Sequence, residues 1–180
     1  MKERKKGMHG YTVGTQMEKV KYISMTGIFA TLITIMTAFI CHIPIGVNGG
    51  YIHFGDAMIY LAAVLLPWPY AMAAAAIGGG LADLLTAPMW VPATIIIKIL
   101  ITIPFTNKTR KFITLHNVLA TIPAYFISSA GYFLAEYLIF GSWSVLLVSM
   151  GQSLIQSLGS AIFFVIIGMA MDRAKVKTKF

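Results

Sequence analysis

The apolar positions of this chain form long runs, and the polar positions gather in the breaks between them. The first run, 22–41, contains no charged residue over about 20 positions, the length that a helix needs to cross a ~30 Å hydrocarbon core. Five further runs follow, separated by short breaks that are mostly rich in Pro, Gly or polar residues, at 55–66, 70–85, 93–105, 116–139 and 144–171. This pattern predicts an all-α integral membrane protein, a compact bundle of six transmembrane helices.

The predicted organisation is a basic cytoplasmic segment at 1–21, a six-helix substrate-binding domain at 22–171 and a basic cytoplasmic tail at 172–180. The second to fourth runs are short and bounded by Pro or Gly, as is typical of helices that border a cavity. A five-span arrangement, with 55–66 re-entrant, is the alternative.

Composition agrees with a membrane protein. The chain is 58% hydrophobic and only 11% charged, less than half the ~25% of soluble domains. It therefore lacks the polar surface of a nucleic-acid module, a disordered tail or a secreted disulfide scaffold, and the lone Cys41 cannot form an intramolecular disulfide. The four histidines are scattered without metal-ligand spacing, so no metal is expected.

The basic residues predict the orientation. Of the 14 Lys and Arg, six precede the first run, three lie in 106–115 and four follow Asp172. Six crossings with both termini cytoplasmic place all three clusters on one side, as the positive-inside rule requires. The breaks that would face outside, 42–54, 86–92 and 140–143, contain no Lys or Arg.

Four charged residues remain within the apolar runs, all in the outer half of the predicted bundle: Asp56, Asp83, Lys98 and Glu136. Charges inside a membrane are costly, so they face the interior, where they form pairs or line a site. One interpretation is structural, with Lys98 neutralised by Asp83 or Glu136. A water-accessible pocket that opens outward is the better explanation, because three acids and one base lie at the same predicted level.

Further polar and aromatic residues surround this level. Gln152 and Gln156 lie one turn apart on the last helix and share a face. Tyr51 and Trp90 lie in the loops above, where stacking on a flat ligand and packing at the membrane interface are equally good interpretations. His53 is either a hydrogen-bond partner or a bystander, and Gly49-Gly50 suits a lid.

Small residues indicate close helix packing. Gly78–Gly80 is expected to let neighbouring helices approach, and the first helix has a stripe of small residues, Gly27/Thr31 and Ala30/Thr34. The chain has no Walker A motif, catalytic Ser/His pair or zinc signature, so neither ATP hydrolysis nor enzyme activity is expected of it.

Three segments, Gly50–Ala63, Gly78–Leu85 and Pro92–Lys98, resemble the substrate-binding S components of energy-coupling factor (ECF) vitamin transporters. The branch they resemble includes pyrimidine-precursor and pyridoxine-type S components. The resemblance implies six helices, cytoplasmic termini and a ligand beneath the first external loop. It also implies a membrane scaffold subunit and two ATPases as partners, which use the ATP, and no cofactor on this chain.

We therefore expect a high-affinity binding subunit in the cell membrane for a small aromatic heterocyclic vitamin or precursor, with no nucleic-acid partner. The residues expected to bind substrate are Asn48, Tyr51, His53, Asp56, Asp83, Trp90, Lys98, Glu136 and Gln152. In this family an alanine pair on the first helix meets the scaffold, so the docking residues expected here, at the same spacing, are Gly27, Ala30, Thr31 and Thr34.

Three alternatives stay open at this point. A solitary proton-coupled transporter would use Asp83 and Glu136 as proton relays. A small intramembrane enzyme would use an acid and a histidine, and a pure assembly protein would need no pocket.

Overall fold

Helices form nearly the whole chain, and each of the six apolar runs is helical over most of its length. The computed structural model describes the backbone of residues 2–40, 43–44, 51–141 and 146–180, and side chains within 16–40, 53–141 and 151–180. In chain order the α-helices are α1 (Lys2–Ala38), α2 (Gly55–Leu65), α3 (Trp68–Thr86), α4 (Val91–Leu100), α5 (Leu115–Leu119), α6 (Thr121–Phe140), α7 (Leu146–Arg173) and α8 (Val176–Lys179). A 3₁₀ turn, η1 (Pro88–Trp90), connects α3 to α4.

A short β-ribbon, which the sequence pattern did not predict, lies between α1 and α2. Strands β1 (Ile43–Pro44) and β2 (Tyr51–Ile52) pair antiparallel, with Ile43 opposite Ile52 and Pro44 opposite Tyr51. The pairing brings the two ends of the 42–54 connection together beside α7 and immediately before α2.

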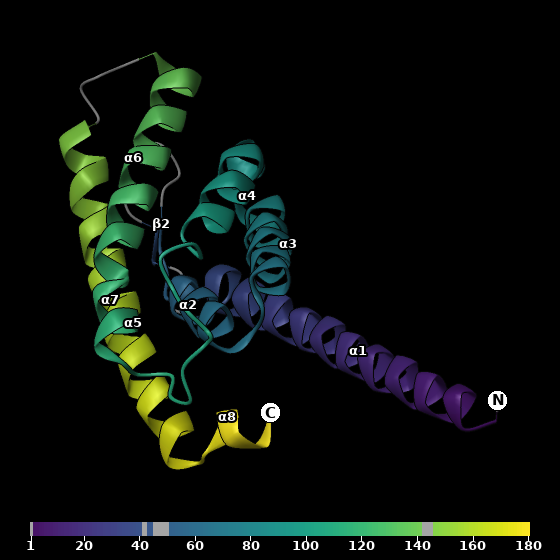
Figure 1. The fold of residues 1–180 in the computed structure, drawn as a ribbon. Helices are drawn as coiled ribbons and strands as arrows, with labels where there is room; N and C mark the ends of the chain where they lie inside the picture. The colour runs from purple at the N-terminus through teal and green to yellow at the C-terminus, as the bar shows by residue number, and fades with distance from the viewer. Residues whose placement is uncertain (1, 41–42, 45–50, 142–145) are drawn as a thin grey trace.

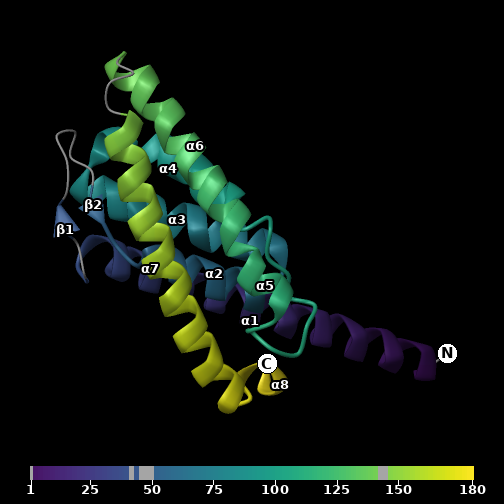
Figure 2. The ribbon, with the colours of Figure 1, turned by 90° about the vertical axis from the view of Figure 1, so that its left-hand side faces the viewer.

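Helix α2 is the centre of the molecule. All eleven of its residues are buried, and it packs against α1, α3 and α7. A helix that is apolar on every side is stable only when other elements surround it. Figures 1 and 2 show α6 and α7 side by side along their length, with α3 and α4 forming a second group and α2 between the two groups.

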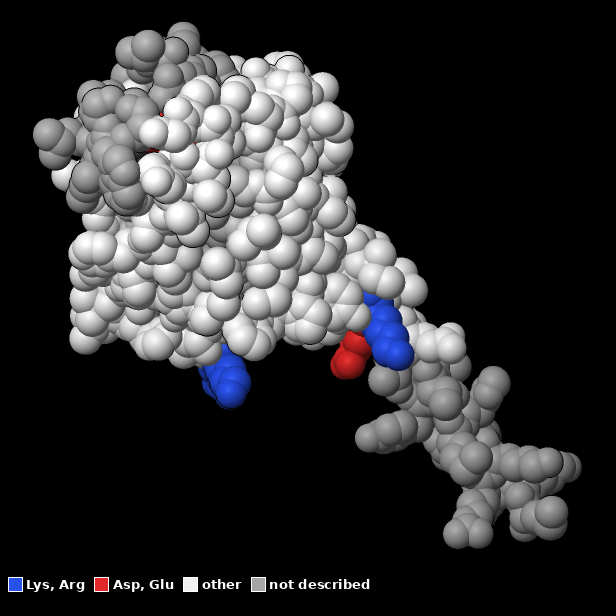
Figure 3. Space-filling view, turned by 90° about the horizontal axis from the view of Figure 1, so that it is seen from above, with Lys and Arg blue, Asp and Glu red and all other residues white. Residues whose placement is uncertain are grey.

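The outer surface is apolar over most of the described chain. Three helical segments are long and apolar enough to cross a membrane: Gln16–Ala38, Leu115–Phe140 and Gly151–Arg173. Large apolar side chains point outward from them, including Ile23, Leu138 and Ile162. Figure 3, which looks from above onto the end of the molecule away from α8, shows few charged residues where they are described, most of them at its edge.

The glycines of α3 allow two helices to approach it closely. A Cβ added to Gly78 would lie 2.7 Å from the carbonyl oxygen of Ala30 on α1, and one added to Gly79 would lie 2.9 Å from Lys98 Cγ on α4. The interpretation of Gly78–Gly80 as packing residues is therefore confirmed.

The three basic segments of the sequence meet at one end of the molecule. Lys177 on α8 donates hydrogen bonds to the backbone carbonyls of Asn107, Thr109 and Lys111, at 3.4, 2.9 and 3.3 Å. Lys21 on α1 bonds the carbonyl of Phe180. The start of the membrane segment of α1, the 101–114 connection and the chain after α7 therefore lie together.

Candidate functional site

The most deeply buried charges form an ion pair between α2 and α4. Lys98 Nζ lies 2.5 Å from Asp56 Oδ1, and both side chains are almost fully enclosed. The other oxygen of Asp56 accepts a hydrogen bond of 3.2 Å from Gln156 Nε2 on α7. Three helices are thus joined through one carboxylate.

Local helix geometry favours both charges. Asp56 lies in the first turn of α2, where the helix dipole stabilises an anion. Lys98 lies in the last turn of α4, where the dipole stabilises a cation. The positions of the two residues in their own helices therefore offset part of the cost of burying them.

A second polar group lies one helical turn away on α4. Thr94 donates a hydrogen bond to Asp83 of α3, and its hydroxyl is 3.0 Å from that of Tyr132 on α6. Lys98 Nζ lies 5.4 Å from the centre of the Tyr132 ring, within the range of a cation–π contact. Asp56, Asp83, Thr94, Lys98, Tyr132 and Gln156 therefore form one continuous group, named the buried polar cluster below.

The acid that pairs with Lys98 is one that the structural interpretation did not name. The ion-pair partner of Lys98 is Asp56, whereas Asp83 accepts from Thr94. The reason is that α2 runs through the middle of the bundle and brings Asp56 against α4, which spacing along the sequence does not reveal.

Trp90 lies beside this cluster, in η1. Its ring meets that of Tyr132 edge-on, with centroids 6.1 Å apart at 68°, and lies 6.2 Å from that of Phe140. The indole Nε1 is buried and has no hydrogen-bond partner within the described part of the chain. Buried donors normally have partners, so this N–H is available to an acceptor that the described residues do not provide.

His53 has a local contact. Its ring is buried, and Nδ1 accepts a hydrogen bond of 3.0 Å from the backbone N–H of Gly55 at the start of α2. Because Nδ1 is an acceptor, a neutral ring carries its proton on Nε2. The histidine thus helps to fix the start of the helix that carries Asp56.

The structure gives less detail about the remaining residues that were expected to bind substrate. Glu136 is buried on α6, one turn beyond Tyr132, and Gln152 lies one turn before Gln156 on α7. The described residues include the backbone of Tyr51, in β2, but not its side chain, and they do not include Asn48 or the Gly49-Gly50 pair.

Three residues of the cluster are not among the binding residues expected from the sequence: Thr94, Tyr132 and Gln156. Each lies four positions from a residue on that list, namely Lys98, Glu136 and Gln152. This i, i+4 spacing from an expected polar residue is the signal that identifies all three.

The expected docking stripe on α1 divides into two faces. Ala30 and Thr34 turn inward, where the Thr34 hydroxyl bonds the carbonyls of Ala30 and Gly78 at 2.9 and 3.0 Å. Gly27 and Thr31 are exposed, and nothing lies within 4 Å of a Cβ added to Gly27. Of the four expected docking residues, only Gly27 and Thr31 are therefore exposed on the surface.

Comparison with known proteins gives the class of the molecule. Residues 17–173 match the family of ECF-type riboflavin transporter S components, and the chain belongs to this family. The family model is that of a transporter S component, which agrees with the long apolar helices of the described chain. The match does not confirm the branch of pyrimidine-precursor and pyridoxine-type S components, and it does not favour a solitary proton-coupled transporter.

One curated relative is similar over a shorter stretch. A protein of Pyrococcus woesei, described as an uncharacterized protein in the gap 3′ region, is 40% identical over 63 residues. The alignment covers 35% of this chain and 43% of that protein, so less than half of the relative's length is matched. The relative carries no functional description.

Proposed function

We propose that this chain is the S component of an ECF-type importer for a flavin, and that it captures riboflavin at the outer face of the cell membrane. The observation that carries the proposal is the buried polar cluster, which places two acids, one base and three neutral polar groups within an apolar bundle. Ionisable groups inside a membrane domain usually belong to a functional site. The family match supports riboflavin over other flat vitamins.

The chemistry of a flavin suits these residues. Its ring system is flat and aromatic, with carbonyl and ring-nitrogen acceptors along one edge, and its ribityl chain carries several hydroxyls. The Trp90 N–H, which has no partner among the described residues, would donate to an acceptor on the edge of the ring, while Tyr51 would stack on or cover the ring. Carboxylates and amides suit hydroxyls, so we assign the polar contacts to Asn48, His53, Asp56, Asp83, Lys98, Glu136 and Gln152.

The proposed topology is six helices with both termini in the cytoplasm. The basic segments in the first part of α1, in 106–115 and after Asp172 lie at one end, and the positive-inside rule assigns that end to the cytoplasm. The cluster then lies toward the outside, beneath the 42–54 connection. Residues 1–21, 22–171 and 172–180 keep their assignment as basic segment, binding domain and basic tail.

Transport itself would need partners. The proposal includes a membrane scaffold subunit and two ATPases, because this chain has no nucleotide-binding motif of its own. Gly27 and Thr31 are the docking positions that we favour on α1, since they are exposed while Ala30 and Thr34 pack against α3.

The test is a titration of the purified chain in detergent with riboflavin, followed by quenching of flavin fluorescence. Pyridoxine and the pyrimidine half of thiamin serve as comparison ligands, scored by thermal stabilisation. We expect saturable riboflavin binding at submicromolar concentration and at least a hundredfold weaker binding of the other two. A folded protein that binds pyridoxine or the pyrimidine in preference would overturn the flavin assignment, and one that binds none of the three would overturn the S-component role.

A further inference from the structure

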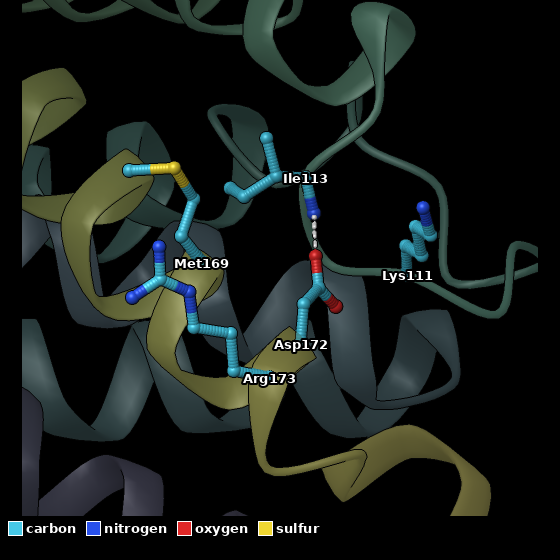
Figure 4. Close-up of a pocket in the computed structure, with 5 residues that line it drawn as sticks. All are labelled: Lys111, Ile113, Met169, Asp172 and Arg173. Carbon is cyan, nitrogen blue, oxygen red and sulfur yellow. Dashed lines mark hydrogen bonds between the residues drawn. The ribbon is translucent and has the colours of Figure 1, made fainter.

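A separate pocket lies at the basic end of the molecule, where the 101–114 connection meets the last turn of α7. It is an open recess of about 370 Å³, and the residues that line it are Lys111, Ile113, Met169, Asp172 and Arg173. Figure 4 shows these side chains, with Met169 and Arg173 on one side of Asp172 and Lys111 on the other. None of them belongs to the buried polar cluster.

The pocket has unpaired positive charge. Lys111 and Arg173 are exposed, and within the described part of the chain neither side chain has an ion pair or hydrogen bond. Asp172 is already engaged, because its two oxygens accept from the backbone N–H groups of Phe112 and Ile113 at 2.7 and 3.0 Å. Two cations against one acid leave the lining residues with a formal charge of +1.

The other side of the pocket is apolar and continues along the membrane-facing surface of α7. Met169 is 44% exposed, and Ile166 and Ile162 precede it on the same face at 56% and 59%. This segment, Gly151–Arg173, is one of those long and apolar enough to cross a membrane, and Arg173 is its last residue. The pocket therefore lies at the level where lipid chains end and headgroups begin.

We propose that this pocket binds an anionic phospholipid, with Lys111 and Arg173 on its phosphate and an acyl chain along Met169, Ile166 and Ile162. A guanidinium group offers two parallel donors to phosphate oxygens, and lysine adds a compact charge. Basic pockets at the cytoplasmic level of membrane helices suit such headgroups. A zwitterionic lipid has the same phosphate but no net charge to match the pocket.

The lipid would act as a bridge between two segments. Lys111 belongs to the 101–114 connection and Arg173 to α7, so a shared phosphate would hold the two together beside the Asp172 contacts. Binding to the folded state alone raises stability, which makes lipid affinity measurable as thermal stabilisation. This site is independent of which vitamin the protein binds.

The experiment compares the full-length protein in detergent with added phosphatidylglycerol, phosphatidylcholine or inorganic phosphate. The pocket variant is Lys111→Gln with Arg173→Gln. The control, Lys108→Gln with Lys179→Gln, removes the same charge at the same end from exposed positions that do not line the pocket. We expect saturable stabilisation by phosphatidylglycerol in wild type and control, and about fivefold weaker apparent affinity for each pocket cation removed.

Equal stabilisation by phosphatidylcholine would overturn the proposal, as would equal loss in the control variant. Stabilisation by inorganic phosphate as strong as that by the lipid would show a site for soluble anions instead. Each single variant is measured alongside the double one, so that a folding defect in the double variant still leaves the fivefold change to be tested. No vitamin is present, so the result does not depend on the flavin proposal.

Discussion

The buried ion pair is the feature that most needs an explanation at the scale of single residues. A buried pair gains Coulomb energy but loses hydration, so an uncharged pair of similar shape is often as stable. Lys98 and Asp56 therefore contribute little net stability together, although either one alone would be costly to bury. We infer that the pair is present because the ligand uses it.

Replacing Lys98 by Met tests this inference. The single change leaves the Asp56 carboxylate buried without its cation, and we expect a loss of about 3 kcal/mol in the free energy of unfolding. Adding Asp56→Asn should restore most of that stability, because the amide still accepts from Gln156 and no charge remains. Riboflavin affinity should stay more than tenfold weaker in both variants.

Thermal unfolding and flavin titration of the same samples separate the two effects. Recovery of binding along with stability in the double variant would assign the pair to folding alone.

Trp90 gives a second prediction at this scale. Trp90→Phe keeps an aromatic ring but removes the unpartnered N–H, so the penalty of a buried unsatisfied donor disappears while some packing is lost. We expect a melting temperature close to that of wild type and flavin affinity about fivefold weaker, the cost of one neutral hydrogen bond. Trp68→Phe, on a half-exposed side chain at the first residue of α3, is the matched control. Equal affinity in the two variants would remove the N–H from the site.

At the scale of elements, the close packing of α1 against α3 depends on the glycines of α3 and on the two different faces of α1. The inward face of α1 carries Ala30 and Thr34, which contact α3 near Gly78. The outward face carries Gly27 and Thr31, where there is open space. Two glycine-to-alanine substitutions therefore test the same helix pair from opposite sides.

We expect Gly78→Ala to destabilise the protein by about 1–3 kcal/mol, because the new Cβ meets backbone and β-branched neighbours that cannot move away cheaply. Gly27→Ala meets nothing and improves helix propensity, so it should be neutral or stabilising. Thermal unfolding in detergent measures both. If the two variants melted at the same temperature, α1 and α3 would not pack as described.

At the scale of the whole molecule, the basic end is held together by hydrogen bonds between segments far apart in the sequence. Lys177 joins α8 to three backbone carbonyls of the 101–114 connection, and Asp172 joins α7 to the same connection. Burial lowers the pKa of Lys177 to about 8, while the Asp172 charge opposes this shift.

This lowered pKa predicts a pH dependence. Because the ordinary lysine pKa is 10.5, the unfolded chain holds a proton that the folded protein releases between about pH 8 and pH 10.5. The free energy of unfolding of wild type should therefore rise with pH across this window, relative to Lys177→Met. Chemical unfolding of both proteins at steps from pH 7 to pH 11 measures the difference. Parallel curves would mean that Lys177 titrates normally.

Much of this molecule could be predicted from its pattern of apolar runs and charges. The apolar runs predicted six helical segments. An apolar segment must satisfy its backbone hydrogen bonds internally, whether lipid or protein surrounds it, and a helix does this. Depth along each helix follows from a rise of about 1.5 Å per residue, so the sequence predicts one level for Asp56, Asp83, Lys98 and Glu136, of which the structure joins Asp56, Asp83 and Lys98 in the buried polar cluster. The segregation of Lys and Arg into three segments predicted that these segments share one end.

Only the tertiary structure decided which groups meet. Sequence spacing defines depth but not the rotation of a helix or its neighbours, and those follow from packing among all the helices. For this reason the partner of Lys98 is Asp56 on the central α2, Thr94 joins Asp83 to Tyr132, and the stripe on α1 divides into an inner and an outer face. The sequence determined the class of protein and predicted that its charged groups share one level, whereas packing determined which polar groups form the cluster.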